Sequence, residues 1–394
     1  MMDIPTALTR DLSVHFKALF GKSPALLVFA PGRINLIGEH IDYNDGFVFP
    51  AAIDKYVGFA LAPSPTENSI IHALDLQEEF HFNANDDFHP DKQHWANYFK
   101  GVLHQYSDVE IAPFQLVFNS TIPIGAGLSS SAALSCGFAY ALNEWTKAGK
   151  TKKEIALIGQ RTEHEFAGVN CGLMDQFASV FGKKDNFMLM DCKDLSFSYI
   201  QTSFSQSTFL LLDSCVKHDL AESAYNQRRI ECDNALSAIK TSFPEITSFR
   251  TCETTHLDAT RTQMGEISFQ RASFVLDEIK RVHQAMEAIE NQDEKALGDL
   301  LNQTHQGLSE KYDVSCPELD YLQKLAIQQK GVFGARMMGG GFGGCLLILL
   351  KKEDQSQVIS TLTKNYLAKF GIEARNYPIQ ISQGIQQLKW YEQV

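Results

Sequence analysis

Apolar residues follow the spacing of helices or strands along most of the chain. Residues 7–20 carry apolar side chains at helical spacing and predict an amphipathic helix. Residues 25–30 are continuously apolar and predict a strand, which should end at Pro31-Gly32 because proline cannot donate to a strand ladder. Further β-branched and aromatic stretches predict strands at 56–62, 69–74, 114–119, 187–190 and 197–200.

Helical patterns fill much of the remaining sequence. Thr151 and Glu154 have the spacing of a capping box and should begin a helix that runs to about Phe166. The other predicted helices are 132–145, 174–181, 221–240, 272–290, 294–309, 317–330 and 354–370, and the later strands are 209–213, 345–350 and 373–381. This mixture predicts an α+β fold with mixed sheets covered by helices.

The length of 394 residues exceeds what one hydrophobic core usually organises, so we expect two domains. The composition turns polar at 203–207, which places the expected boundary between 1–204 and 205–394. Each part contains both predicted helices and predicted strands. We therefore expect two α+β domains.

Charge and composition narrow the class of partner. The formal net charge of −12 argues against nucleic acid or an anionic membrane as the main partner, although a local positive site can still hold a nucleotide. The eight cysteines show no C-x-x-C spacing, which favours reduced thiols in a cytoplasmic protein. The first residues are too polar for a signal peptide, and the longest apolar run, 345–350, is too short to span a bilayer.

A glycine- and serine-rich turn at 121–131 separates a predicted strand from a predicted helix. Glycines allow close backbone approach to a ligand, serines can cap the helix, and the helix N-terminus favours an anion such as phosphate. The turn has no lysine and is not a Walker A loop, while Gly125-x-Gly127 fits only half of a dinucleotide-binding motif. A simple helix cap remains the alternative.

A second glycine cluster lies at 339–344 and matches the spacing G-x-G-x-x-G. A dinucleotide-binding loop is followed by a helix, whereas this cluster precedes the predicted strand 345–350. The sequence therefore argues against a nicotinamide enzyme. A tight backbone crossing or a wall of the active site is the favoured interpretation.

Two further stretches concentrate polar side chains. Residues 33–44 bring together Arg, Asn, Glu, His, Asp and Tyr, a set that could donate to and accept from sugar hydroxyls, although a solvated loop is also possible. Glu163 and Asp175 lie on either side of a glycine-containing turn. One could hold Mg²⁺ and the other act on a substrate hydroxyl, or they could be an exposed helix residue and a helix-start residue.

Together these stretches resemble the motifs of the GHMP small-molecule kinases. Residues 123–132 resemble their ATP loop and 337–344 their C-terminal glycine motif. Residues 32–43 resemble the signature of the galactokinase branch, as do 171–176 and 225–232. One departure is Ile41, where threonine is more usual.

The resemblance implies a two-domain fold with the active site between the domains, and ATP-dependent phosphorylation of the C1 hydroxyl of galactose, the first step of galactose catabolism. It implies that Asp175 is the catalytic carboxylate and that Arg33 stabilises the transferring group. The implied sugar-binding residues are Glu39, His40, Ile41, Asp42, Gly172 and Tyr225. The implied nucleotide-binding residues are Gly125, Ala126, Gly127, Leu128, Ser129, Ser130, Ser131 and, beside the adenine, Trp95. Ser131 and Glu163 are implied ligands of Mg²⁺.

Other functions remain open at this point. An N-acetylgalactosamine kinase of the same branch would differ near the sugar C2, and a non-catalytic galactose and ATP sensor would be expected to lack a catalytic part. Arg33, the three serines, Glu163 and Asp175 are all present, which favours an enzyme. We expect a cytoplasmic monomer with no nucleic-acid or membrane partner.

Overall fold

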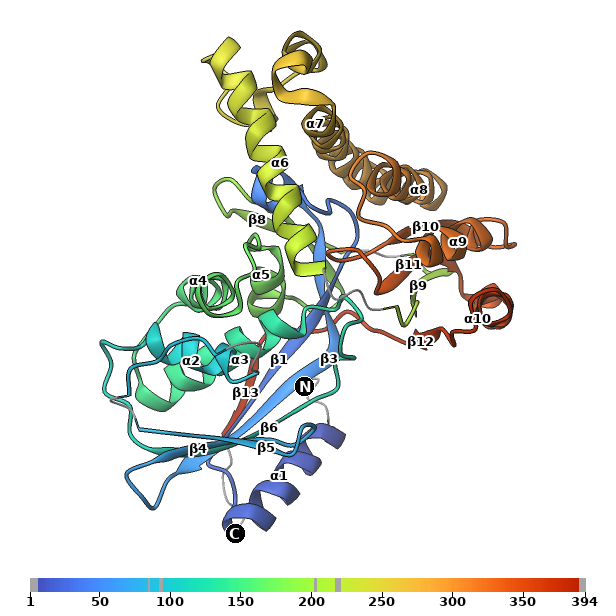
Figure 1. Cartoon of the computed structure of the whole chain (residues 1–394). Coiled ribbons are helices and arrows are strands. Elements are labelled where there is room, and N and C mark those ends of the chain that lie inside the picture. The colour runs from blue at the N-terminus through green and yellow to red at the C-terminus, as the bar shows by residue number, and fades with distance from the viewer. Residues whose placement is uncertain (1–5, 84–85, 92–94, 202–203, 217–220, 390–394) are drawn as a thin grey trace.

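The computed structural model describes residues 6–83, 86–91, 95–201, 204–216 and 221–389, which form two lobes (Figure 1). The helices are α1 (Thr6–Phe20), α2 (Asn97–His104), α3 (Ser130–Thr146), α4 (Lys152–Thr162), α5 (Met174–Phe181), α6 (Ala221–Ser242), α7 (Thr254–Glu290), α8 (Glu294–Glu310), α9 (Pro317–Ala326) and α10 (Gln355–Phe370). The strands are β1 (Leu26–Asn35), β2 (Phe47–Val48), β3 (Pro50–Pro63), β4 (Ser69–Ala73), β5 (Glu78–Phe82), β6 (Phe114–Ser120), β7 (Asn186–Asp191), β8 (Phe197–Gln201), β9 (Ser207–Asp213), β10 (Val332–Met337), β11 (Cys345–Lys351), β12 (Arg375–Tyr377) and β13 (Gln386–Lys389). The expected α+β fold with mixed sheets covered by helices is confirmed.

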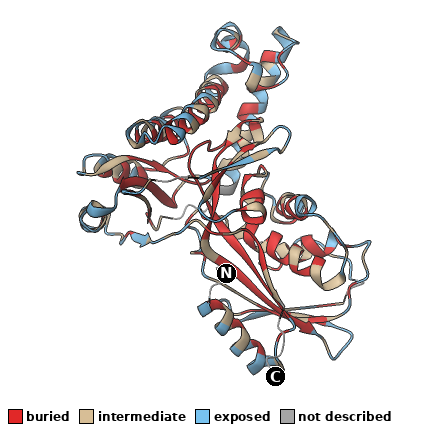
Figure 2. Cartoon of the chain, turned by 180° about the vertical axis from the view of Figure 1, so that it is seen from behind, coloured by how far each residue is buried: buried red, intermediate tan, exposed pale blue. Residues whose placement is uncertain are grey.

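A six-stranded sheet organises the first lobe in the order β13-β1-β3-β6-β4-β5. Helix α1 covers one face and α2 to α5 lie on the other (Figure 1). Because side chains alternate along a strand, Leu27 and Phe29 of β1 pack with α1, whereas Val28 and Ala30 face the larger core. Burial on both faces explains the continuous apolar run, and Figure 2 shows the central strands as buried.

Strand β1 does not end at Pro31-Gly32, so that prediction was wrong. It continues to Asn35, with an irregular register between Pro31 and Arg33. A side chain at Gly32 would lie 2.6 Å from the carbonyl oxygen of Leu128, and the Arg33 N–H donates to that oxygen at 3.1 Å. The irregularity therefore lets the strand pass the glycine-serine turn and positions Arg33 beside it.

The second lobe contains a four-stranded antiparallel sheet in the order β10-β11-β9-β12, packed against α8 and α9, and α10 packs against α9. Strand β10 was not predicted. Helix α7 begins at Thr254 rather than near residue 272, with a kink at Gly265, where φ is 76° and ψ is 162°. Helix α9 ends at Ala326, before the predicted 330. The remaining predicted helices and strands are present, although β3 extends back to Pro50 and the expected strand 373–381 is limited to β12.

The last described strand returns to the first lobe. β13 pairs with β1 in an antiparallel register that sets Leu388 opposite Leu27. Figure 1 shows the red β13 beside the blue β1. A third, three-stranded sheet has the order β2-β7-β8. In the part of the chain that the structure describes, every helix is too short or too polar to cross a bilayer.

Candidate active site

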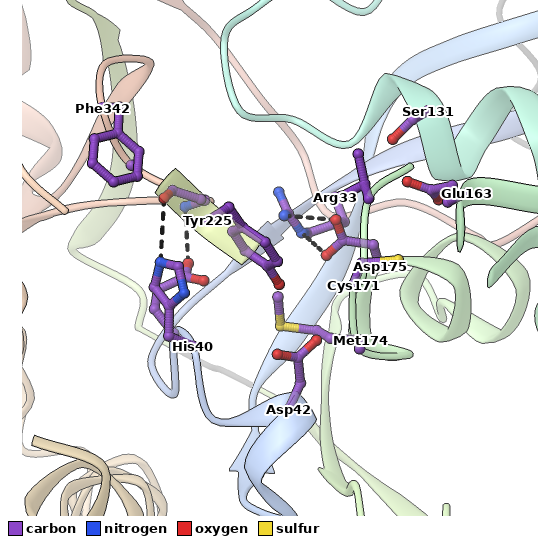
Figure 3. A pocket seen from close by; sticks show the side chains of 16 residues that line it. Arg33, His40, Asp42, Ser131, Glu163, Cys171, Met174, Asp175, Tyr225 and Phe342 are labelled. Atoms are coloured by element: carbon purple, nitrogen blue, oxygen red, sulfur yellow. Dashed lines mark hydrogen bonds and ion pairs between the residues drawn. The ribbon is translucent and has the colours of Figure 1, made fainter. Parts of the chain in front are cut away.

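A cavity of about 230 Å³ lies where the two lobes meet, and residues from both halves of the sequence line it (Figure 3). Its walls combine the polar stretch after β1, the start of α3, the turn between α4 and α5, α6 and the glycine-rich loop before β11. The lining residues are Arg33, Glu39, His40, Asp42, Ser131, Glu163, Val169, Cys171, Gly172, Met174, Asp175, Tyr225 and Gly339 to Phe342. The cavity therefore gathers several residues from each of three of the sequence stretches, and the glycine-serine turn contributes Ser131.

The glycine-serine turn is built from left-handed backbone positions. Gly125 and Gly127 have φ values of 78° and 72°, and Ser129 has a φ of 57°. The side chains of Ala126 and Leu128 are buried and anchor the turn in the core. Ser129 precedes α3 but does not cap it through its side chain, which corrects the expected capping role.

The hydroxyl of Ser129 instead binds the carboxylate of Asp175, donating to Oδ2 at 2.5 Å. Asp175 lies in the first turn of α5. Arg33 holds the same carboxylate through two parallel hydrogen bonds, from Nε to Oδ1 at 2.7 Å and from Nη2 to Oδ2 at 2.9 Å (Figure 3). Its remaining nitrogen, Nη1, donates to the carbonyl of Gly127 at 2.6 Å. Arg33 thus joins the predicted catalytic carboxylate to the predicted phosphate loop.

Burial lowers the pKa of the Arg33 guanidinium, but the negative charges of Asp175 and Glu39 together raise it by more. The pKa therefore lies above its ordinary value. Arg33 remains a cation in a cavity with several carboxylates. A fixed cation with planar donors suits a phosphoryl group as well as a carboxylate.

Glu163 follows the end of α4, where the helix changes to a π-helical turn, Glu163–Ala167, instead of continuing as α-helix to Phe166. Gln176 donates to Glu163 Oε1 at 2.7 Å, and Ser131 also donates to this carboxylate. Burial, followed by the nearby charge of Asp175, raises the pKa of Glu163 to about 7. The π-turn therefore directs a buried carboxylate toward Ser131, and such turns are often found at functional sites.

Ser131 and Glu163 are the implied ligands of Mg²⁺, an ion that prefers hard oxygen ligands. A hydroxyl and a carboxylate fit this preference, and Mg²⁺ in kinases is held by one or two carboxylates together with substrate phosphates. No group of three or more His, Cys, Asp or Glu side chains suited to a metal occurs among the described residues. The pair is therefore compatible with a cation that arrives with phosphates.

Glu39 is held from the second lobe. Arg336 donates from Nη2 to Glu39 Oε1 at 2.8 Å, and the Gly339 N–H donates to the same oxygen at 3.0 Å. Burial raises the pKa of Glu39, but the charges of Arg336 and Arg33 outweigh it and leave that pKa below its ordinary value. Glu39 is a buried carboxylate ion whose position depends on both lobes.

Asp42, Gly172 and Tyr225 form another wall of the cavity. Figure 3 shows the side chains of Asp42 and Tyr225. A side chain at Gly172 would lie 2.0 Å from Asp42 Oδ2, so only glycine leaves room for this carboxylate. Burial, followed by the charges of Asp175 and Glu39, raises the pKa of Asp42 to about 7. The wall therefore places a carboxyl group, a backbone segment and a phenol around one space.

Ile41, Trp95 and the loop residues 125–130 are predicted site residues that do not line this cavity. The side chain of Ile41 is fully buried in the core. Trp95 packs against Phe99 and Phe118, with ring centroids 5.7 and 5.5 Å away, and its indole donates to Glu78. Neither side chain lines the cavity.

The sequence analysis missed two residues that orient the site, Gln176 and Arg336. Arg336 is fully buried, and its guanidinium also donates to the backbone carbonyls of Asn35, Leu36 and Met337. A single arginine between apolar residues directly before a glycine cluster could have indicated a buried ion pair, but its partner could not be read from the spacing.

Comparisons of the sequence with known families and proteins point to one kinase family. Residues 15–63 match the galactokinase galactose-binding signature, 97–183 the GHMP kinases N terminal domain and 285–368 the GHMP kinases C terminal domain. A galactokinase from Thermotoga maritima is 38% identical over 363 residues, covering 92% of this chain and 99% of that protein. A Homo sapiens galactokinase is 37% identical, covering 89% of this chain and 90% of that protein.

Comparison with solved structures points to the same family. The crystal structure of Lactococcus lactis galactokinase complexed with galactose has a TM-score of 0.90 and 31% sequence identity, covering 97% of this chain and 100% of that chain. A mevalonate kinase has a TM-score of 0.65 at 20% identity, which shows a shared fold alone. The expected family is confirmed: the chain belongs to the galactokinase family of the GHMP kinases and is an ATP-dependent sugar kinase.

Proposed function

We propose that the chain transfers the γ-phosphoryl group of ATP to the C1 hydroxyl of galactose, giving galactose 1-phosphate and ADP. The observation that carries this proposal is the Arg33–Asp175 pair, which joins the loop 125–131 to the cavity that contains Glu39 and Asp42. A carboxylate that faces a hydroxyl and a cation that faces a phosphoryl group are the two parts that in-line transfer needs.

The chemical step forms a bond between the C1 oxygen and the γ-phosphorus and breaks the bond from that phosphorus to the β–γ bridging oxygen. Asp175 accepts or steers the proton of the attacking hydroxyl. Arg33 stabilises charge on the transferring group, since its guanidinium is already oriented before the reaction. The electron pair of the broken bond leaves with ADP.

For the sugar, we propose that Glu39, His40, Asp42, Gly172 and Tyr225 form the pocket, with His40 contributing its ring because both of its nitrogens are hydrogen-bonded within the protein. The support is that all five line one cavity and together offer donors and acceptors. Ile41 would contribute through its backbone alone, because its side chain is buried. The relative of known structure that was crystallised with galactose supports this choice of sugar.

For the nucleotide, we propose that the backbone of Gly125 to Ser131 and the first N–H groups of α3 hold the phosphates. Ser131 and Glu163 would hold Mg²⁺, which supplies charge neutralisation on the phosphates when bound. The Glu163 proton would be released when the cation binds, because its pKa lies near 7. Trp95 remains a proposal for the border of the adenine pocket.

We also propose that the chain is a cytoplasmic monomer and that its two domains divide near residue 205. β9 begins the sheet of the second lobe just after this point, and β13 crosses back to the first. Gel filtration coupled to light scattering tests the monomer: a mass near 44.1 kDa is expected and a mass near twice that value contradicts it.

A sugar panel tests the proposed reaction. Purified protein with ATP and Mg²⁺ is offered galactose, 2-deoxygalactose, N-acetylgalactosamine, glucose and mannose, and ADP release is measured. ADP release with galactose at the highest kcat/KM is expected. Preference for N-acetylgalactosamine would make the chain a kinase of that sugar, and no ADP release with any sugar would favour a sensor.

A further inference from the structure

A series of hydrogen bonds runs from the glycine-rich loop of the second lobe through the polar stretch after β1 and back to α6. His40 lies with Nε2 3.2 Å from the carbonyl oxygen of Gly340 and with Nδ1 2.7 Å from the hydroxyl of Tyr43. The Tyr43 hydroxyl lies 2.9 Å from that of Tyr312, which lies 3.1 Å from Cys232 Sγ. These five residues come from the polar stretch after β1, helix α6, the loop after α8 and the loop before β11.

The imidazole of His40 is enclosed by aromatic rings. Its ring centroid lies 4.9 Å from that of Tyr312, 5.2 Å from that of Tyr225 and 5.9 Å from that of Tyr43. His40 is only 3% exposed, and burial lowers its pKa to about 4, so the ring is neutral near pH 7. A neutral imidazole has one N–H donor and one acceptor nitrogen.

The hydrogen-bond partners of the two His40 nitrogens decide which nitrogen carries the proton. The Gly340 carbonyl can only accept, so Nε2 must be the donor and Nδ1 the acceptor. Nδ1 then accepts from the Tyr43 hydroxyl, whose oxygen accepts from Tyr312. The Tyr312 oxygen is left to accept from the Cys232 thiol. His40, Tyr43 and Tyr312 each give one hydrogen and receive one, while Gly340 only receives and Cys232 only gives, so the buried donors of these residues are satisfied.

The backbone at His40 also indicates a fixed arrangement. Its φ is 60°, a left-handed value that is unfavourable for a residue with a side chain. Asn44 donates from Nδ2 to the His40 carbonyl at 2.8 Å and holds the turn. Such positions persist where surrounding contacts determine them, and they occur often at ligand sites.

We propose that Tyr43 and Tyr312, with Cys232 at the end of the chain, are positioning residues that hold His40 as the Nε2–H tautomer and fix its ring between Gly340 and Tyr225. Gly340 faces Tyr225, since a Cβ on this glycine would lie 3.4 Å from the Tyr225 ring. The network therefore sets the distance between the two walls of the cavity that come from the second lobe. Its effect on galactose rests on the function proposed above.

The first test observes the His40 nitrogens directly. Long-range ¹H–¹⁵N correlation spectra of the labelled full chain at pH 7, without ligands, report the protonation of each ring nitrogen, and His40→Gln assigns the His40 signals. Protonated Nε2 and unprotonated Nδ1 are expected. Tyr43→Phe should move the Nδ1 resonance because that nitrogen loses its donor. Tyr106→Phe is the matched control. Tyr106 is also buried, but its hydroxyl lies outside this hydrogen-bond network and donates to the Ala139 carbonyl at 2.8 Å.

The second test is kinetic. Tyr43→Phe and Tyr312→Phe should raise KM for galactose roughly three- to ten-fold, the effect of one lost hydrogen bond, with KM for ATP and kcat unchanged. Cys232→Ser, which keeps a donor, should give a smaller rise than Cys232→Ala. Tyr106→Phe should leave both KM values unchanged.

Three results overturn the proposal. A proton on Nδ1 of His40 in the native chain contradicts the assigned tautomer. If Tyr43→Phe does not move the Nδ1 resonance, Tyr43 is not part of the hydrogen-bond network. If the resonance moves but the KM for galactose is unchanged, the network has no role in the sugar pocket. If no hexose is phosphorylated, the proposed function fails instead, while the nitrogen spectra still decide the hydrogen-bond pattern.

Discussion

Arg33 binds Asp175 through two parallel hydrogen bonds of 2.7 and 2.9 Å and donates with its third nitrogen to Gly127. One side chain therefore fixes the distance between the carboxylate that faces the acceptor and the loop that faces the donor. Phosphoryl transfer depends mainly on such positioning and on charge neutralisation. The pair is the structural centre of the proposed mechanism.

Arg33→Ala should lower kcat by about 10²–10³, because it removes one preorganised charge donor. Arg33→Lys keeps the charge but not the planar fork, so it should recover only part of the loss. Steady-state kinetics with galactose and ATP measure both variants. An unchanged kcat with a raised KM would make Arg33 a ground-state binding residue instead.

Ser129→Ala should lower kcat about ten- to hundred-fold, because the hydroxyl donates to the Asp175 carboxylate at 2.5 Å. Thr146→Ala is the matched control, since its hydroxyl donates to the Leu142 carbonyl at the other end of α3. The control should retain the native kcat. A Ser129→Ala enzyme within twofold of the native kcat would show that this hydrogen bond does not orient Asp175 for reaction.

Arg336→Met should destabilise the protein by about 3–5 kcal/mol, because it leaves the buried Glu39 carboxylate without its cation. The pKa of Glu39 is depressed, so the stability that the pair contributes is present above about pH 4.5 and is lost as the pH falls through the folded-state pKa. Denaturant unfolding at pH 7 and at pH 4 measures this difference.

Lys295→Met is the control for this variant, since it breaks the exposed Lys295–Asp299 pair, whose side chains are 82% and 54% exposed. Its effect should stay within about 0.5 kcal/mol. Equal effects of the Arg336 and Lys295 variants would contradict the assignment of Glu39 as a charged group that depends on Arg336.

Asp42→Asn should stabilise the ligand-free protein at pH 8 by about 2–4 kcal/mol. The pKa of Asp42 is raised by burial from 3.8 to about 7, so this carboxyl lowers the stability as the pH rises from about 4 to about 7. Below about pH 4 the group is protonated in both states, and the difference should disappear. Thermal unfolding of both proteins from pH 4 to pH 8 measures this difference in stability.

Asp108→Asn provides the comparison, because Asp108 is an exposed carboxyl on the loop after α2. The difference in stability between this variant and the native protein should not grow with pH. An Asp42→Asn difference in stability that also stays constant from pH 4 to pH 8 would contradict the raised pKa of Asp42.

Local patterns predicted most elements and the main site residues, because helix spacing, strand runs and glycine turns act over short distances. The pairing of Arg336 with Glu39 joins residues 297 positions apart, and no local pattern specifies such a partner. β10 was missed because its six residues include a glycine and this arginine, and β13 because pairing with β1 stabilises it. At Ser129, sequence predicted a helix cap, but the nearby Asp175 competes for the hydroxyl.

The most direct measurement identifies the product and the residue that makes it. Native protein and Asp175→Asn are incubated with galactose, ATP and Mg²⁺, and ³¹P NMR with proton coupling locates the new phosphate. The expected result is phosphate coupled to the anomeric proton with the native protein and almost none with a folded Asp175→Asn variant. Phosphate on another hydroxyl, or equal product from both proteins, would contradict C1 phosphorylation that depends on Asp175.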